Sequence, residues 1–168
     1  FSSSFLLFLV NTSVYAQCNG SADNCGKQYN EVAYLTTHNA YNTDSEGFSL
    51  PNQHQGIADQ LNQGVRAFML DVYDFWGTPT QYHGSFALGT QALSSDLTEI
   101  KNFLDANSNE IVTLILECYV SADDIEAELI NTGLLPYVYT HLDGAAWPTL
   151  QEMINLNKRL VVFSDVAD

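Results

Sequence analysis

The chain carries a ten-residue apolar run at Ile111–Val120, which reads Ile-Val-Thr-Leu-Ile-Leu-Glu-Cys-Tyr-Val. Its β-branched content and its lack of polar alternation predict a strand that is buried on both faces. Glu117 lies inside this run, and a buried carboxylate needs a partner because burying it alone is costly. The chain has only five Lys and Arg residues. A metal ion or a protonated histidine is therefore favoured over a structural cation as the partner of Glu117.

Apolar strands and amphipathic helices alternate around this run. Further strands are predicted at Val32–Thr37, Arg66–Tyr73 and Leu160–Phe163, and a brief extended segment ends at Tyr82-His83. Strand and helix in strict alternation predict a parallel sheet with helical crossovers, either an open doubly wound sheet or a (β/α)8 barrel. No Gly-rich loop follows the first strand, which argues against dinucleotide binding. A barrel takes ~250 residues, so this chain would form about half of one; its lack of an initial Met favours a fragment.

Four helices are predicted from apolar spacing and capping residues. Gly64 is expected to stop a short helix at Ile57–Leu61. Ser95 is expected to cap a helix over Leu93–Leu104. Two helices are expected to begin at capping pairs, Ser121 with Asp124 and Thr149 with Glu152.

The N-terminal region predicts an exported, extracellular protein. Residues 1–16 contain the apolar run Phe-Leu-Leu-Phe-Leu-Val at positions 5–10 and then Val14-Tyr15-Ala16, as in the remnant of a secretory signal peptide. The alternative is a buried first strand or helix. We expect a Cys-containing segment over residues 17–28 and a partial barrel domain over residues 29–168.

The chain has three cysteines, and an exported protein can form disulfides. Cys18 and Cys25 flank a short Gly-, Asn- and Ser-rich segment that permits a local disulfide. Cys118 is expected to be a buried thiol, with any partner lying beyond the end of the chain. No Cys/His spacing indicates zinc. Asn19-Gly20-Ser21 is a glycosylation sequon, a triplet that also arises often by chance.

The net charge of −15 argues against some classes of binding partner. A nucleic-acid groove needs clustered Lys and Arg, which this chain lacks. An anionic bilayer would repel the protein, so at most a transient membrane-surface contact is expected. We expect a soluble, exported monomer.

Polar side chains stand near the carboxyl ends of the predicted strands, where barrels gather their functional groups. They are His38, Asn39, Asp71, Asp74, His83 and Glu117. Two imidazoles and nearby carboxylates meeting at one barrel mouth would suit acid–base catalysis near neutral pH. His54 and His141 lie in polar, loop-like surroundings and are predicted to be surface residues.

Four motifs match one known family in order and spacing. Thr36-Thr37-His38-Asn39-Ala40-Tyr41 resembles the first motif of the phosphatidylinositol-specific phospholipase C X domain, and the segment 64–75 resembles its second. Tyr82-His83-Gly84 resembles the second catalytic-histidine motif, and Val112–Glu117 resembles the strand with a metal-binding glutamate. The likeness runs from about Tyr29 to Ser164 and is greatest to exported X-domain proteins of plants, fungi and related eukaryotes.

The resemblance implies an α/β fold, an incomplete TIM (β/α)8 barrel of the phospholipase C-like phosphodiesterase type. It implies a phosphoric diester hydrolase that cleaves between a lipid glycerol and an inositol headgroup. His38 would be the general base for the attacking hydroxyl, and His83 would protonate the departing oxygen. In the metal-dependent branch, Asn39, Asp71 and Glu117 correspond to Ca²⁺ ligands, and oxygen donors suit this cation.

Two departures from the family pattern limit these expectations. Met69 replaces an acidic residue of the metal-dependent branch, and a thioether is a poor calcium ligand. The Ca²⁺ site is therefore expected to be weak or to need substrate phosphate. The metal-free bacterial branch has Arg at the position of Asp71, so the chain does not fit that branch. The second half-barrel, which would supply most headgroup contacts, is absent, and this half is not expected to be active alone.

Two other functions remain open. A glycerophosphodiesterase or a sphingomyelinase D-like enzyme would usually place an acidic pair around the second strand, and Met69 and Asn39 argue against it. A non-catalytic exported binding protein with the same barrel is favoured by Met69, whereas the presence of both His38 and His83 argues against it.

Overall fold

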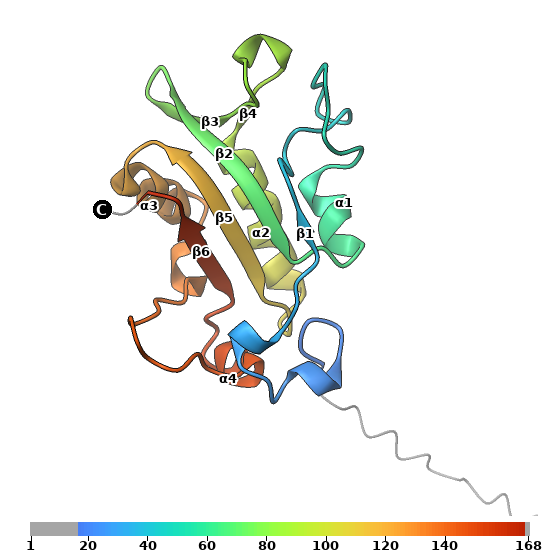
Figure 1. Cartoon of the computed structure of the whole chain (residues 1–168), viewed down its shortest axis with the longest axis vertical. Helices are drawn as coiled ribbons and strands as arrows, with labels where there is room; N and C mark the ends of the chain where they lie inside the picture. Colours follow the sequence, from blue (N-terminus) through green and yellow to red (C-terminus); the bar gives the residue numbers. More distant parts are fainter. Residues whose placement is uncertain (1–16, 167–168) are drawn as a thin grey trace, which may run out of the picture.

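A six-stranded sheet organises the chain in the computed structural model, which describes residues 17–166 (Figure 1). The predicted signal peptide, residues 1–16, lies outside the described residues. The strands are β1 (Thr36–Thr37), β2 (Ala67–Phe75), β3 (Thr78–Gln81), β4 (Gln91–Ala92), β5 (Val112–Tyr119) and β6 (Leu160–Ser164). The α-helices are α1 (Ile57–Asn62), α2 (Leu93–Ala106), α3 (Ala122–Asn131) and α4 (Leu150–Asn155). Short 3₁₀ turns are η1 (Ala22–Asn24), η2 (Tyr29–Glu31), η3 (Phe86–Leu88) and η4 (Leu135–Tyr137).

The sheet is parallel where the alternating pattern predicts it. β2 pairs in parallel with β1 on one side and with β5 on the other, and β5 pairs in parallel with β6. β1 is shorter than predicted, because only the last two residues of Val32–Thr37 join the ladder.

The expectation of strict alternation is wrong at β3 and β4, which are antiparallel to their neighbours. The cause is the two-residue turn between β2 and β3. Trp76 and Gly77 both have positive φ, 54° and 82°, and two such residues form the primed turn that matches strand twist. Phe75 and Thr78 are consequently paired across the hairpin.

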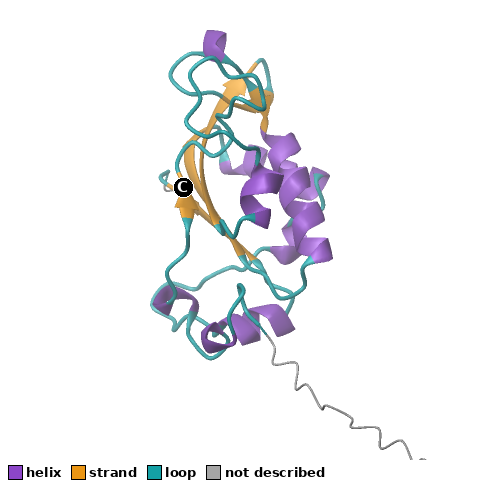
Figure 2. Ribbon diagram, turned by 90° about the vertical axis from the view of Figure 1, so that its right-hand side faces the viewer, coloured by secondary structure: helices purple, strands orange, loops and turns teal. Residues whose placement is uncertain are grey.

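One face of the sheet carries the main core. Side chains of β2, β5 and β6 pack there against α1, α2 and α3, and Figure 2 shows helices gathered on that side. The predicted capping pairs at Ser121 and Thr149 are confirmed. The Ser95 cap is wrong: α2 starts at Leu93 because β4 leads directly into it through Ala92.

The prediction that β5 is buried on both faces is also wrong. Its residues alternate towards the carboxyl end, with Leu116 and Cys118 buried but Glu117 and Tyr119 exposed. The helices α1, α2 and α3 cover the face that holds Leu116 and Cys118, whereas α4 packs on the opposite face only near Val161, the register partner of Thr113. Thr113 is buried on the opposite face because Tyr29 covers it, with the two hydroxyl oxygens 2.6 Å apart. The residues of this run therefore lie in two different environments. Near the start of β5 both faces are covered, and near its carboxyl end only the face of Leu116 and Cys118 is covered.

The N-terminal segment packs under the sheet. The predicted Cys18–Cys25 disulfide is confirmed, and Cys18 joins a second core with Tyr29, Leu150 and Met153. The Asn19 side chain donates to the carbonyl of Ile111 and accepts from its N–H, at 3.1 and 2.7 Å. The sequon side chain therefore anchors the start of β5.

Candidate active site

Two different strands flank one edge of β2, and the candidate site lies where they separate. β1 pairs with Ala67 and Phe68, whereas β3 pairs with the segment Val72–Phe75. Between them, the turn that follows β1 closes onto β2, where the Ala40 N–H donates to the Met69 carbonyl at 3.1 Å. The histidines stand at the ends of these two flanking strands, His38 directly after β1 and His83 shortly after β3.

Asn39 connects the two turns. Its φ of 47° is a left-handed conformation that asparagine tolerates better than most residues. The side chain is 1% exposed, and its Nδ2 lies 3.1 Å from Nδ1 of His83 and 3.4 Å from Oδ1 of Asn52. The Asn39 Oδ1 atom is buried with no hydrogen-bond partner among the described residues. An unpartnered buried carbonyl oxygen is a suitable ligand for a hard cation.

His83 is held through one ring nitrogen. Its Nδ1 lies 3.2 Å from Oδ2 of Asp71, and its side chain is half exposed. The Asp71 carboxylate can only accept from Nδ1, whereas the Asn39 amide nitrogen can only donate to it, so the two contacts favour opposite tautomers of the neutral ring. Both contacts are made to Nδ1, which leaves Nε2 as the nitrogen available to a substrate, as in other His–carboxylate pairs that act as acids or bases.

Asp71 is buried, as predicted, and is 5% exposed. Besides His83, it accepts a hydrogen bond of 3.1 Å from the Tyr41 hydroxyl. Burial raises the pKa of Tyr41, and the charge of Asp71 raises it further. Tyr41 therefore remains a neutral donor, and it binds the same carboxylate oxygen, Oδ2, that lies against His83.

Glu117 lies beside Asp71 in the sheet but does not share its environment. The two residues are register partners on neighbouring parallel strands, and so are Tyr73 and Tyr119, two residues further along each strand. Glu117 is exposed and accepts a hydrogen bond of 2.6 Å from the Tyr119 hydroxyl, which raises the pKa of Tyr119. The expectation that Glu117 is buried is wrong, because no helix within residues 17–166 packs over the carboxyl end of the face on which it stands. The rings of Tyr73, Tyr119 and Tyr82 form a stack next to these acids.

The other predicted positions divide into two groups. His38 is exposed, and its carbonyl accepts from Nε2 of Gln53 at 2.9 Å, which secures its turn. His54 is a surface residue, as predicted, with a side chain 90% exposed. His141 is not: it is half-buried because its ring stacks on Trp147 at 3.9 Å. Within residues 17–166, no three or more His, Cys, Asp and Glu side chains are grouped closely enough to hold a metal ion.

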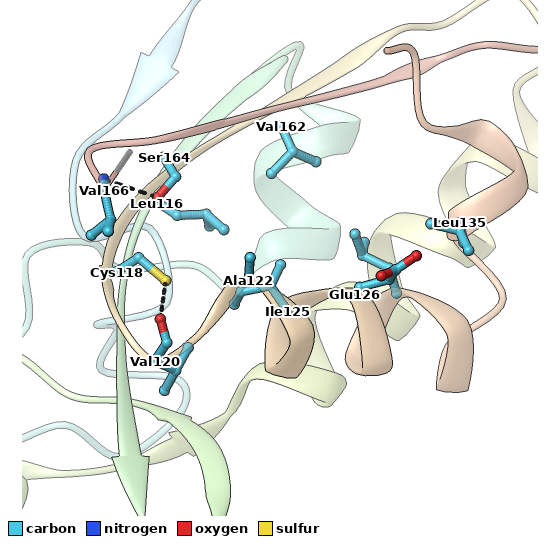
Figure 3. A pocket seen from close by; sticks show the side chains of 11 residues that line it. Leu116, Cys118, Val120, Ala122, Ile125, Glu126, Leu135, Val162, Ser164 and Val166 are labelled. Carbon is cyan, nitrogen blue, oxygen red and sulfur yellow. Dashed lines mark hydrogen bonds between the residues drawn. The ribbon is translucent and has the colours of Figure 1, made fainter. Parts of the chain in front are cut away.

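An apolar cavity of about 240 Å³ lies on the helix-covered face and is separate from this constellation. Leu116 and Ile125 line it, together with Cys118, whose Sγ donates to the Val120 carbonyl at 3.5 Å (Figure 3). The expectation that Cys118 is a buried thiol is confirmed. Because side chains alternate along β5, Glu117 faces the opposite side from this cavity.

Three residues of the site had no role in the sequence interpretation. Tyr41 follows Asn39 by two positions inside the first motif, and Tyr119 follows Glu117 by two positions on the same strand face. Spacing alone could have suggested both. Asn52 accepts from Nδ2 of Asn42 at 2.8 Å as well as from Asn39, and no local pattern of its loop indicates this.

Comparisons with known proteins identify relatives over most of the chain. The PI-PLC X 1 family model matches residues 24–168. A PI-PLC X domain-containing protein of Arabidopsis thaliana is 34% identical over 160 residues, which cover 84% of this chain and 37% of that protein. An uncharacterized secreted protein of Arthroderma benhamiae is 30% identical over 155 residues, covering 88% of this chain and 35% of that protein. The chain thus spans only a third to a half of the length of the curated relatives it matches.

Solved structures share the fold at low sequence identity. A Staphylococcus aureus phosphatidylinositol-specific phospholipase C aligns with a TM-score of 0.66 and 20% identity, covering 86% of this chain and 51% of that one. PLC21 of S. officinalis aligns with a TM-score of 0.61 and 20% identity, covering 86% of this chain and 19% of that one. The chain therefore has the fold of part of a phospholipase C-type TIM barrel. None of the helices described in residues 17–166 is long and apolar enough to cross a membrane.

Proposed function

Because the chain belongs to the PI-PLC X family, we propose that it carries the histidine-bearing half of an exported phospholipase C-like phosphodiesterase. The substrate class is a phospholipid or a related headgroup phosphodiester. Phosphatidylinositol is the first compound to test, since the S. aureus relative is named for it. The name of the fungal relative supports an extracellular location.

The contact of His83 with Asp71 carries this proposal. The 3.2 Å approach of Nδ1 to the carboxylate orients the ring, and the carboxylate stabilises the positively charged imidazolium. His83 can then protonate the oxygen that leaves phosphorus as the P–O bond breaks. His38, directly after β1, accepts the proton of the headgroup hydroxyl as that oxygen bonds to phosphorus. The two histidines thus exchange one proton each with the substrate in opposite directions.

A bound Ca²⁺ is part of the proposal. Asn39, Asp71 and Glu117 would hold it, and the ion would offset negative charge on the phosphoryl oxygens. Two observations support this donor set: the Oδ1 of Asn39 is buried without a partner among the described residues, and Asn39 and Asp71 both contact Nδ1 of His83. Met69 contributes no oxygen, and Glu117 is bonded to Tyr119. We therefore propose a weak site that substrate phosphate strengthens.

The activity test uses the full-length protein with phosphatidylinositol and, separately, with glycerophosphodiesters, each with added Ca²⁺ or a chelator. His38→Ala and His83→Ala should each lower the rate by ~10²–10⁴-fold. His54→Ala is the matched control, because the His54 side chain is exposed and pairs with Asp44 at the surface. Wild-type rates in both the His38 and His83 variants would overturn the acid–base assignment.

Metal binding is tested without turnover. Titration calorimetry with Ca²⁺ should show binding to the wild-type protein that Asp71→Asn abolishes, and a soluble phosphodiester analogue should tighten the wild-type affinity. If Ca²⁺ binding is absent with and without the analogue, the metal proposal fails while the histidine proposal remains under its own test.

A further inference from the structure

A buried carboxylate outside the candidate site joins both ends of the loop that carries His83. Asp96 lies in the first turn of α2 and is 1% exposed. Its Oδ2 accepts from Nε2 of Gln81 at 2.7 Å, and its Oδ1 accepts from Nε2 of Gln91. No ion pair among residues 17–166 involves Asp96. One carboxyl group therefore binds two amides and no cation.

The two amides come from a cross-strand pair. Gln81 is the last residue of β3 and Gln91 is the first of β4, and they are register partners. The nine residues between them, 82–90, form the loop in which His83 stands. Asp96 thus fastens this loop to α2 at the points where the chain leaves β3 and returns in β4.

The loop that carries His83 is only partly held by packing. Residues 83–87 are all exposed, Phe86 contacts the rings of Phe75 and Tyr82, and Tyr82 stacks on Tyr73. Further along the loop, the Leu88 carbonyl accepts from the N–H of Ser49 at 2.8 Å, and Gly89 packs against Phe48. His83 follows Gln81 by two positions, so its place relative to Asp71 depends on where β3 ends. The pairing of Gln81 with Val72 of β2 and the Asp96 contacts together hold that point.

We propose that Asp96 is a positioning residue for His83. By binding Gln81 and Gln91, it closes the base of the 82–90 loop and keeps the imidazole against Asp71; these two contacts are called the clasp below. This role deepens the proposed phosphodiesterase function and rests on it. Asp96 touches no reacting atom; it acts through Gln81 and the backbone that leads to His83.

Charge and hydrogen-bond capacity suit this role. Burial raises the pKa of Asp96 to about 7, against the lowering effect of the Gln81 and Gln91 amides. Glu99 of α2 and Glu46, in the segment between β1 and α1, raise it further. The Gln81 Oε1 is buried without a hydrogen-bond partner among the described residues. If the Gln81 amide turns over, this oxygen can accept from a protonated Asp96, so the clasp has a partner in either charge state.

The test compares three variants with a control on the same helix. Asp96→Ala removes both acceptors, Gln91→Ala releases only the β4 side, and Asp96→Asn keeps the shape and one acceptor. Asp105→Asn is the control, because Asp105 lies on α2 but pairs at the surface with Lys101. Hydrogen exchange by mass spectrometry follows residues 82–90, and steady-state kinetics follow kcat and KM separately.

Asp96→Ala should speed exchange in residues 82–90 by at least about tenfold and lower kcat by ~10²-fold, since displacement of a catalytic group by about 1 Å has an effect of this size. KM should change little. Asp96→Asn should recover most of kcat. The kcat and exchange rate of Gln91→Ala should lie between those of Asp96→Ala and the wild type, and those of Asp105→Asn should match the wild type. If Asp96→Ala does not fold, Gln91→Ala supplies the same two readouts.

Wild-type exchange in residues 82–90 would overturn the clasp, and so would faster exchange spread evenly over the molecule. A loosened loop with unchanged kcat would overturn the link to His83. If the wild-type protein hydrolyses no phosphodiester, the proposed function fails, and the exchange measurements alone then support or overturn the clasp.

Discussion

The buried carboxyl of Asp96 makes the stability of the protein depend on pH in a predictable direction. Its pKa is raised from 3.8 to about 7 in the folded state, mainly by burial. A shift of about 3 units corresponds to roughly 4 kcal/mol, at 1.36 kcal/mol per unit. The folded state binds the proton more tightly than the unfolded chain does. The stabilisation that comes from protonated Asp96 is therefore complete below the unfolded pKa near 3.8, decreases as the pH rises, and is lost above about 7.

Asp96→Asn isolates this contribution, because asparagine has the same shape and does not titrate. Urea unfolding of the wild type and the variant should be compared at pH 4, 6 and 8. The free energy of unfolding of the variant, minus that of the wild type, should increase with pH by up to about 4 kcal/mol and level off above pH 7. The increase should be spread over the interval between the two pKa values.

Asp105→Asn provides a control of opposite sign. The pKa of Asp105 is lowered by its hydrogen bond from Lys101 and then by that from Tyr137. Its contribution is therefore present at neutral pH and is lost only as the pH falls below the usual aspartate range, so the difference between the wild type and Asp105→Asn should stay nearly constant from pH 4 to 8. A constant difference between wild type and Asp96→Asn from pH 4 to 8 would refute the reasoning, because it would mean that the amides compensate the buried charge completely.

Three further substitutions test how the fold supports the site. Gly89→Ala should destabilise the protein by about 1–3 kcal/mol in urea unfolding, since φ is 137° and the added Cβ would lie 2.6 Å from the Phe48 ring; an unchanged midpoint would contradict the packing of the loop. Replacing Cys18 and Cys25 together by Ala should cost about 2–3 kcal/mol by thermal unfolding, as expected for a short closed loop. Equal stability of the wild type with and without reductant would argue against a structural bridge. Asn19→Ala should cost about 1–3 kcal/mol by losing both hydrogen bonds to the start of β5, and an effect below 0.5 kcal/mol, the scale of an ordinary surface substitution, would contradict that anchor.

Much of the site could be predicted because its residues occupy short motifs at strand ends. His38, Asn39 and His83 were placed near strand ends, and the structure links Asn39 to His83 at 3.1 Å. Asp71 was predicted to be buried and partnered, and it is. Glu117 was placed on the correct strand but in the wrong environment. An apolar run reports the average burial along a strand, and it does not say which face a helix will cover.

The alternation of elements along the sequence predicted the parallel strands. Side chains close together in the chain predicted the caps at Ser121 and Thr149 and permitted the Cys18–Cys25 bridge. The antiparallel return at Trp76-Gly77, the open face under Glu117 and the meeting of Gln81 and Gln91 at Asp96 were decided only by tertiary structure. Hydrophobic periodicity encodes which side of one element is buried. A buried polar side chain instead takes whichever partner the folded chain brings within about 3 Å, and that partner is set by contacts through space.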